Sequence, residues 1–261
     1  MHPFPSLLLA SLTVALALLS DANASRLLVA QLGIGMLLFQ FAIGITNDVA
    51  DAVDDSATKP WKPIPRGAVS RERAVLYAGL CAGGGLVVTF TLPLGAWLIG
   101  LAGLSCGLAY DVVFKRTVLS WLPYAIAIPL LPAWVYVALE SWSGLLWWIF
   151  PLGALLGLTI HLTNQLPDIE HDRGRGIRSA VQRAGARRSY GAALAAFGTA
   201  ASIAVVTLVF RDPGRALLAA ADAAVAVAMS PRATSLFGRD GLFGLLATAS
   251  AILAVVFLSA V

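Results

Sequence analysis

Two short segments of the chain combine an Asn with several carboxylates, a set of side chains that suits a divalent cation. The first runs from Asn47 to Asp55 in the pattern N-D-x-x-D-x-x-D-D, and the second from Asn164 to Asp172 in the pattern N-x-x-x-D-x-E-x-D. The whole chain has only 14 Asp and Glu, so their concentration in these segments is notable. One such segment alone is equally consistent with a solvated acidic loop. Two segments whose carboxylates have the same spacing favour a shared chemical role.

Helical continuation through these segments predicts which carboxylates lie together. Asp51 and Asp55 would share one face, with Asp48 three residues before Asp51, and Asp168 and Asp172 would share another. Carboxylates stacked in this way repel each other unless a cation lies between them. Mg²⁺ prefers hard oxygen ligands and takes its remaining ligands from water and phosphate. It also neutralises the charge that develops on a departing diphosphate. The spacing therefore predicts a site for Mg²⁺ and a diphosphate.

Basic and polar residues near these segments are candidates for binding the diphosphate, because Lys and Arg pair with phosphate oxygens. Prolines between Lys59 and Gly67 exclude a helix there and predict an extended strip. An alternative explanation for the basic residues is the general excess of Lys and Arg in cytoplasmic loops of membrane proteins. The candidate substrate-binding residues are Lys62, Arg66, Tyr110, Lys115, Arg116, Asn164 and Arg178.

The elements that position these residues are predicted to be membrane-spanning helices. Hydrophobic residues make up 59% of the 261 residues and charged residues only 12%, and apolar runs of near-spanning length recur along the chain. We predict a single transmembrane domain over residues 1–261, with nine helices. Their expected ranges are Phe4–Ser20, Arg26–Thr46, Arg71–Thr91, Leu94–Tyr110, Leu119–Leu139, Ser143–Leu162, Ser189–Phe210, Arg215–Met229 and Gly241–Ala260.

The distribution of positive charge predicts the orientation of these helices. Of the 18 Lys and Arg, 15 lie in or at the edge of the loops that follow the second, fourth, sixth and eighth helices, and the exceptions are Arg26, Arg211 and Arg215. The positive-inside rule places those loops, and with them both acidic segments, at the cytoplasmic face. The net charge of +4 is thereby explained without a nucleic-acid partner. The first helix also resembles a signal peptide, but no Lys or Arg precedes it.

The two segments resemble the motifs of the UbiA superfamily of intramembrane prenyltransferases. The first matches NDxxDxxxD at every defined position, and Asp168 and Asp172 match DxxxD. The stretch from Lys62 to Gly67 resembles the family's RPIPSG, with Lys for Arg and Arg for Ser. The stretch from Asp172 to Ser179 resembles its DRxxGIRT. One departure is clear: the family commonly has Tyr and Lys four residues apart, whereas Tyr110 and Lys115 are five apart, which leaves open whether Lys115 or Arg116 faces the diphosphate.

The resemblance implies nine helices around a central cavity, with the motifs in two cytoplasmic caps. It further implies that Asn47, Asp51, Asp168 and Asp172 reach Mg²⁺. Asp48 and Asp55 would help to position the metal or the basic groups, and the spacing above also makes Asp55 a candidate ligand. The implied reaction is prenyl transfer from an allylic prenyl diphosphate to an aromatic or quinone-precursor acceptor, within membrane lipid.

Two other functions stay open at this point. A terpene cyclase of the same superfamily would ionise the same diphosphate and use a double bond of the prenyl chain as the nucleophile. A cation carrier with acidic rings is disfavoured, because the acidic residues gather at one end of the helices and not along a pore. His161 and the aromatic residues Tyr110, Trp121 and Tyr124 are further candidates near the site, and packing roles explain them equally well.

Overall fold

The structure is a computed structural model that describes residues 3–174 and 178–260, and within these ranges it contains helices and no β-strand. The predicted all-helical fold is confirmed for this part of the chain. The residues form two compact units. The first comprises residues 1–113 and 130–142, and the second comprises residues 114–129 and 143–261.

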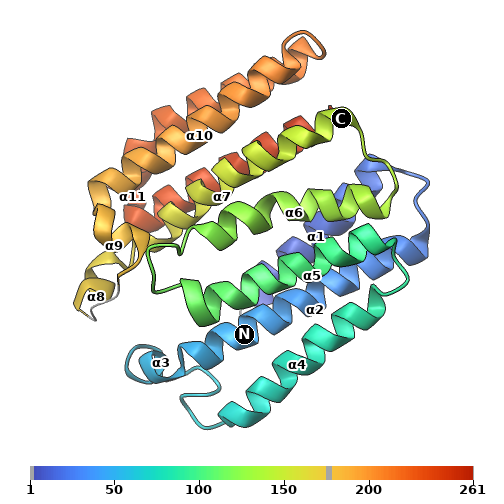
Figure 1. Ribbon diagram of the computed structural model, residues 1–261. Coiled ribbons are helices and arrows are strands. Elements are labelled where there is room, and N and C mark those ends of the chain that lie inside the picture. The colour runs from blue at the N-terminus through green and yellow to red at the C-terminus, as the bar shows by residue number, and fades with distance from the viewer. Residues whose placement is uncertain (1–2, 175–177, 261) are drawn as a thin grey trace. The chain divides into compact units, whose positions relative to one another are not determined.

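The first unit is organised around its second helix. It contains α1 (Pro3–Ser20), α2 (Arg26–Ala50), α3 (Ala52–Thr58), α4 (Arg71–Val88), α5 (Leu94–Ala109), most of the π-helical turn η1 (Tyr110–Phe114) and the later part of α6 (Leu122–Ala138). Helix α2 packs against α1, α4 and α5 (Figure 1). A Cβ atom at Gly85 of α4 would lie 2.6 Å from the ring of Phe39 on α2. Glycine therefore permits the close approach of these two helices.

The second unit holds the remaining helices. They are the early part of α6, the 3₁₀ helix η2 (Gly144–Trp148), α7 (Ile149–Gln165), α8 (Ile169–Gly174), α9 (Ala180–Ala184), α10 (Ala186–Leu208) and α11 (Pro213–Leu258). Helix α7 packs against α10 and α11. Helix α7 also approaches α6 closely, because a Cβ atom at Gly153 would lie 2.7 Å from Pro129 and one at Gly157 would meet the Tyr124 carbonyl. The G-x-x-x-G spacing thus allows close packing in this unit.

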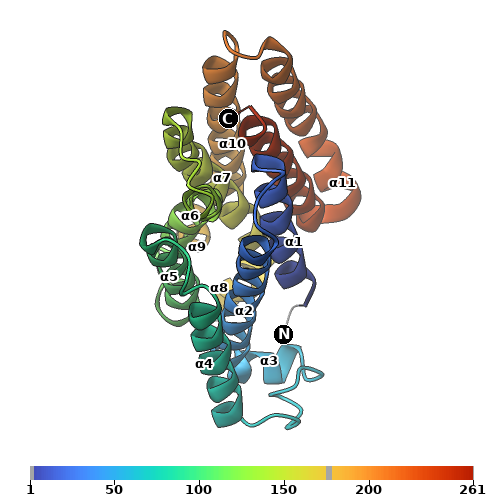
Figure 2. The same ribbon diagram turned by 90° about the vertical axis from the view of Figure 1, so that its right-hand side faces the viewer.

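The last helical segment, α11, consists of two antiparallel helices. Gly238 interrupts it with φ 66° and ψ −157°, and Arg215 Nε near one end donates to Ser259 Oγ just past the other at 3.1 Å. A straight helix of 46 residues would be about 70 Å long, so these atoms could not meet. Figure 2 shows the chain reversing in α11. The eighth and ninth predicted helices correspond to these two parts.

The eighth helix is longer than predicted, because Pro231 does not end it. Proline cannot donate to the carbonyl four residues earlier, which here is Val227. The hydroxyl of Ser230 donates to that carbonyl at 2.9 Å and replaces the missing bond. The predicted end at Met229 is therefore wrong, and the helix continues to the kink at Gly238.

The helices are suited to a lipid environment. Five helical segments of the described chain are long and apolar enough to cross a membrane: Arg26–Ala50, Leu94–Phe114, Gly144–Gln165, Ala186–Leu208 and Pro213–Leu258. Two shorter apolar helices are Ser6–Ser20 and Leu122–Ala138. Large apolar side chains point outward, for example Val87 on α4 and Val206 on α10, which are 74% and 70% exposed. Such a surface suits hydrocarbon better than water.

Candidate active site

The first acidic segment lies where α2 ends and α3 begins. Asn47 and Asp48 belong to the last turn of α2, and Asp54 and Asp55 belong to α3. Asp51 separates the two helices with φ −92° and ψ 0°. The amide of Asp51 donates to the Asn47 carbonyl at 2.9 Å, and that of Asp55 donates to the Asp51 carbonyl at 2.8 Å. The helical hydrogen-bond spacing therefore passes through the segment, although the helix itself is interrupted at Asp51.

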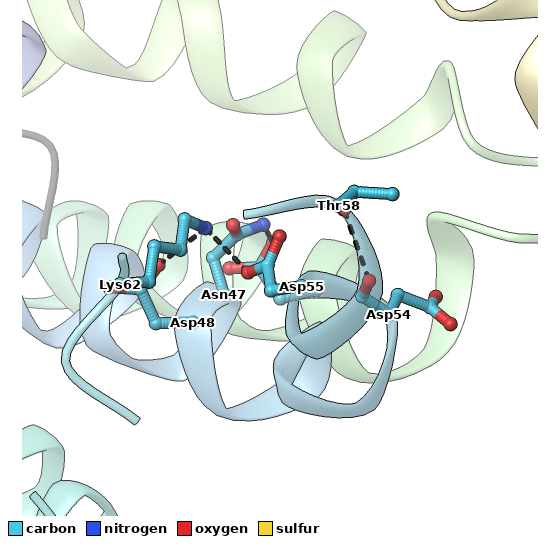
Figure 3. Close-up of polar contacts among 7 residues, drawn as sticks. Asn47, Asp48, Asp54, Asp55, Thr58 and Lys62 are labelled. Atoms are coloured by element: carbon cyan, nitrogen blue, oxygen red, sulfur yellow. Dashed lines mark hydrogen bonds and ion pairs between the residues drawn. The ribbon is translucent and has the colours of Figure 1, made fainter. Parts of the chain in front are cut away.

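Lys62 lies between two carboxylates of this segment. Its Nζ is 2.9 Å from Asp48 Oδ1 and 2.6 Å from Asp55 Oδ2 (Figure 3). The three side chains are only 11%, 8% and 6% exposed, so both ion pairs are largely withdrawn from solvent. Burial lowers the pKa of Lys62, but its hydrogen bonds and attraction to Asp55 and Asp48 outweigh burial and raise the pKa above its ordinary value of 10.5. Lys62 is therefore a cation at every physiological pH.

The loop that carries Lys62 forms successive turns, and the predicted extended strip is wrong. The amide of Lys62 donates to the Lys59 carbonyl at 3.0 Å, and that of Arg66 donates to the Lys62 carbonyl at 3.1 Å. Proline fixes φ near the value required at the first central position of a turn, so a proline-rich stretch favours turns as well as extended chain. Gly67 follows with φ 74°, a conformation that favours glycine.

Asn47 is held by a carboxylate that sequence reasoning missed. Its Nδ2 donates to Asp111 Oδ1 at 2.7 Å, and Asp111 is buried. Asp111 lies in η1, at the end of α5 and 64 positions from Asn47. The available signal was an acidic residue directly after a long apolar helix, since an acid in such a place requires a partner.

The π-helical turn also bears on the spacing of Tyr110 and Lys115. A π turn is closed by a hydrogen bond between residues i and i+5, and so contains one more residue than an α-helical turn. The extra residue between Tyr110 and Lys115, relative to the family pattern, coincides with this turn. Helix geometry then favours Lys115 over Arg116 as the equivalent of the family's Lys. Lys115 is half-buried, whereas Arg116 is exposed.

The second acidic segment lies in the second unit, where α7 ends and α8 begins. Asn164 is exposed in the last turn of α7, and Asp168 is exposed in the turn that follows. Asp172 belongs to α8, but its side chain lies outside the described part of the structure. Arg178 is exposed just before α9.

Contacts from other helices fix this turn. Gln182 of α9 donates through Nε2 to the Ile169 carbonyl at 2.7 Å. Arg239, just after the kink of α11, donates through Nη1 to the Leu166 carbonyl at 3.2 Å and lies 3.8 Å from Glu170. The turn that carries Asp168 is therefore hydrogen-bonded to α9 on one side of Asp168 and to α11 on the other.

His161 belongs to a buried polar cluster in the same unit. Its Nε2 lies 3.0 Å from Ser120 Oγ, and both side chains are fully buried. Ser120 Oγ also accepts a hydrogen bond from the Ala180 amide, at the start of α9. The ring of Tyr124 lies 5.1 Å from that of His161. These contacts join α7 to the loop before α6 and to the chain that follows the second acidic segment.

The side chains present fit Mg²⁺ better than a softer ion. Among the side chains that the structure describes, which do not include His171 and Asp172, no group of three or more His, Cys, Asp or Glu forms a metal-binding cluster. A metal here would therefore draw on other donors as well, and the oxygens of Asn47 and of a diphosphate are hard ligands of the kind that Mg²⁺ prefers.

These features define the class of protein: an all-helical membrane protein with Asn/Asp segments at the ends of two long apolar helices. The chain matches the UbiA prenyltransferase family over residues 7–242, which include both segments. The chain belongs to this family and is an integral membrane protein. The resemblance inferred from the motifs is confirmed.

Relatives and solved structures agree with this assignment. The digeranylgeranylglyceryl phosphate synthase of Methanoregula boonei is 33% identical over 178 residues, which are 64% of this chain and 61% of the relative. The matched regions cover between 24% and 61% of the curated relatives' lengths. A UbiA homologue from Archaeoglobus fulgidus has a TM-score of 0.75 at 16% identity, with 98% of this chain and 94% of that one covered.

A UbiA homologue from the same organism has also been solved bound to DMAPP and Mg²⁺. Its TM-score is 0.70 at 16% identity, and 97% of this chain and 98% of that one are covered. At such identities the likeness shows a shared fold.

Proposed function

We propose that the chain is a Mg²⁺-dependent prenyltransferase that moves a prenyl group from an allylic prenyl diphosphate to a lipophilic acceptor in the membrane. Family membership supports the reaction class. The observation that carries the proposal is the buried arrangement at the end of α2, where Lys62 binds Asp48 and Asp55 while Asp111 holds Asn47. Such an arrangement fixes the first acidic segment before any substrate binds.

The metal-binding roles follow from this arrangement. Asn47 and Asp51 of the first segment and Asp168 and Asp172 of the second are proposed to hold Mg²⁺, which neutralises charge on the departing diphosphate. Asp55 is predicted above as a further ligand. Its short contact with Lys62 favours the alternative role, in which Asp48 and Asp55 position a basic group.

The basic residues are proposed to bind the diphosphate oxygens. Lys115, at the end of the π turn, is the first candidate, and Arg66, Arg116 and Arg178 are exposed and able to reach a ligand from solvent. Lys62 would act mainly through the carboxylates that it pairs with. Tyr110 and Asn164 complete the proposed substrate-binding set.

The proposed reaction begins with heterolysis of the allylic carbon–oxygen bond. Its electron pair leaves with the diphosphate, and an allylic carbocation remains. A nucleophilic atom of the acceptor then bonds to the cation and loses a proton. The resemblance of the motifs implies an aromatic or quinone-precursor acceptor. The name of the Methanoregula relative instead favours an acceptor that carries a glyceryl phosphate group.

We further propose that both units form one catalytic domain with nine spans. Within the described residues, α1, α2, α4, α5, α6, α7, α10 and the two parts of α11 supply that number. The distribution of Lys and Arg supports a cytoplasmic site with the N-terminus inside. Helix α6 contributes residues to both units, which supports a single domain.

The test is mass spectrometry of the lipid products of the purified protein. It would be incubated with allylic diphosphates of several chain lengths, with either aromatic or glyceryl phosphate acceptors, and with Mg²⁺ or EDTA. A prenylated acceptor that forms only with Mg²⁺ supports the proposal. A cyclic hydrocarbon formed without acceptor would identify a terpene cyclase, and full turnover in EDTA would refute the metal dependence.

A further inference from the structure

We propose that Asp111 is a positioning residue that fixes the carboxamide of Asn47 so that its oxygen faces the metal-binding side of the first acidic segment. This inference rests on the proposed function, because it concerns how one proposed Mg²⁺ ligand is oriented. It adds a residue outside both acidic segments to the site.

The direction of the hydrogen bond fixes the orientation of the amide. Asp111 is buried and its Oδ1 lies 2.7 Å from Asn47 Nδ2. A carboxylate has no proton to donate, so only the NH₂ group of the carboxamide can face it. The two ends of a planar amide point in different directions, and the Asn47 oxygen is consequently turned away from Asp111. Only that oxygen can bind a cation.

Without this contact the amide would have two orientations. Rotation by 180° exchanges its oxygen and nitrogen at little steric cost, and the NH₂ group would then present hydrogens to Mg²⁺. Acidic and carbonyl partners of metal ligands commonly remove this freedom, and loss of such a partner typically weakens metal binding about 10- to 100-fold. Asp111 is such a partner for Asn47, because it accepts the hydrogen bond from the Asn47 amide.

The local backbone supports a specific role for Asp111. It lies in a π-helical turn, and such turns occur frequently at functional sites. A charged carboxylate at the end of an apolar membrane helix also costs free energy, whereas a neutral residue there would be tolerated without a partner. The alternative is that Asn47 merely satisfies a buried carboxylate and that metal binding is indifferent to the pair.

A reciprocal exchange separates these alternatives. Asp111→Asn can either donate to or accept from Asn47, so it no longer selects one amide orientation. The pair Asn47→Asp with Asp111→Asn restores a single arrangement, in which the new amide donates to the new carboxylate and a carboxylate oxygen faces the metal. Net charge is unchanged in this pair. Asp54→Asn is the matched control, because Asp54 points away from Lys62 and Asp55 (Figure 3).

The measurement is Mn²⁺ binding, followed by electron paramagnetic resonance, with a non-ionising prenyl thiodiphosphate present. We expect Asp111→Asn to weaken binding about 10-fold or more, the reciprocal pair to return within about threefold of wild type, and Asp54→Asn to change little. Unchanged binding in Asp111→Asn overturns the inference, as does a loss that the pair fails to recover. If Asp111→Asn does not fold, the reciprocal pair alone tests the inference, and its Mn²⁺ binding must again lie within about threefold of wild type. Wild type that binds no Mn²⁺ under these conditions would refute the proposed function itself.

Discussion

Replacement of Lys62 by Met tests whether the two ion pairs at the end of α2 hold the first acidic segment together. The change keeps an unbranched side chain one heavy atom shorter and leaves Asp48 and Asp55 without their shared cation in a site where both are almost fully buried. Removal of one partner from a buried ion pair costs about 3–5 kcal/mol of folding free energy. Lys59→Met is the control, because Lys59 is exposed in the same loop. It should change stability by less than about 0.5 kcal/mol.

The pH dependence gives a second readout. The pKa of Lys62 is raised in the folded protein above its ordinary value of 10.5. The stabilisation of the folded state by Lys62 is therefore complete below pH 10.5 and is lost only as pH rises through the pKa of the folded protein. Wild type should therefore keep the contribution from pH 5 to 9. In Lys62→Met the two buried carboxylates lose the cation that they share, so the destabilisation should shrink as pH falls toward the carboxyl range near about 4.

Unfolding would be followed by intrinsic fluorescence in mixed detergent–SDS micelles at pH 5 and pH 8. The reasoning would be refuted if Lys62→Met were as stable as Lys59→Met at pH 8. It would also be refuted if the loss of stability were the same at both pH values.

Three further predictions concern the helices around the site. Gly157→Leu should destabilise the protein by about 1–3 kcal/mol, since the new side chain meets a backbone carbonyl, whereas Gly198→Leu has open space around its Cβ and should be neutral in the same unfolding assay. His161→Phe and Ser120→Ala each break the same hydrogen bond. The turnover lost in the double variant should therefore be well below the sum of the single losses in a double-mutant cycle. Cysteines placed in the loops after α2 and α7 should react with impermeant thiol reagents from the cytoplasmic side alone, and labelling from outside would contradict the proposed orientation.

The local patterns of the sequence predicted most of the helices and the place of both acidic segments. Apolar runs mark membrane helices directly, because lipid requires a continuous stretch of about 20 apolar residues. The Asn/Asp spacing then predicted a candidate site, because it depends only on neighbouring residues. The reversal at Gly238 was anticipated as a loop, but Ser230 compensates for Pro231 and lengthens the preceding helix.

The polar partners within the first unit could not be predicted in the same way. Asp111 is far from Asn47 in sequence, and their contact depends on the packing of α5 against α2. Lys62 pairs with Asp48 and Asp55 because a series of turns returns it to the end of α2, and its predicted contact with a diphosphate stays a prediction. Long-range contacts of this kind follow from tertiary packing, which a local pattern does not encode.

The most direct test of the central claim compares the turnover of Asp51→Ala, Asp172→Ala and Asp54→Ala at saturating Mg²⁺. Asp51 and Asp172 are proposed metal ligands from the two segments, whereas Asp54 points away from the ion-paired cluster (Figure 3). Loss of an electrostatic stabiliser of the departing diphosphate should reduce turnover at least about 100-fold in the first two variants. Asp54→Ala should stay within a few-fold of wild type, and all three should elute alike on size exclusion. Equal losses in Asp51→Ala and Asp54→Ala would contradict the assigned face. Full activity in both Asp51→Ala and Asp172→Ala would contradict the diphosphate site.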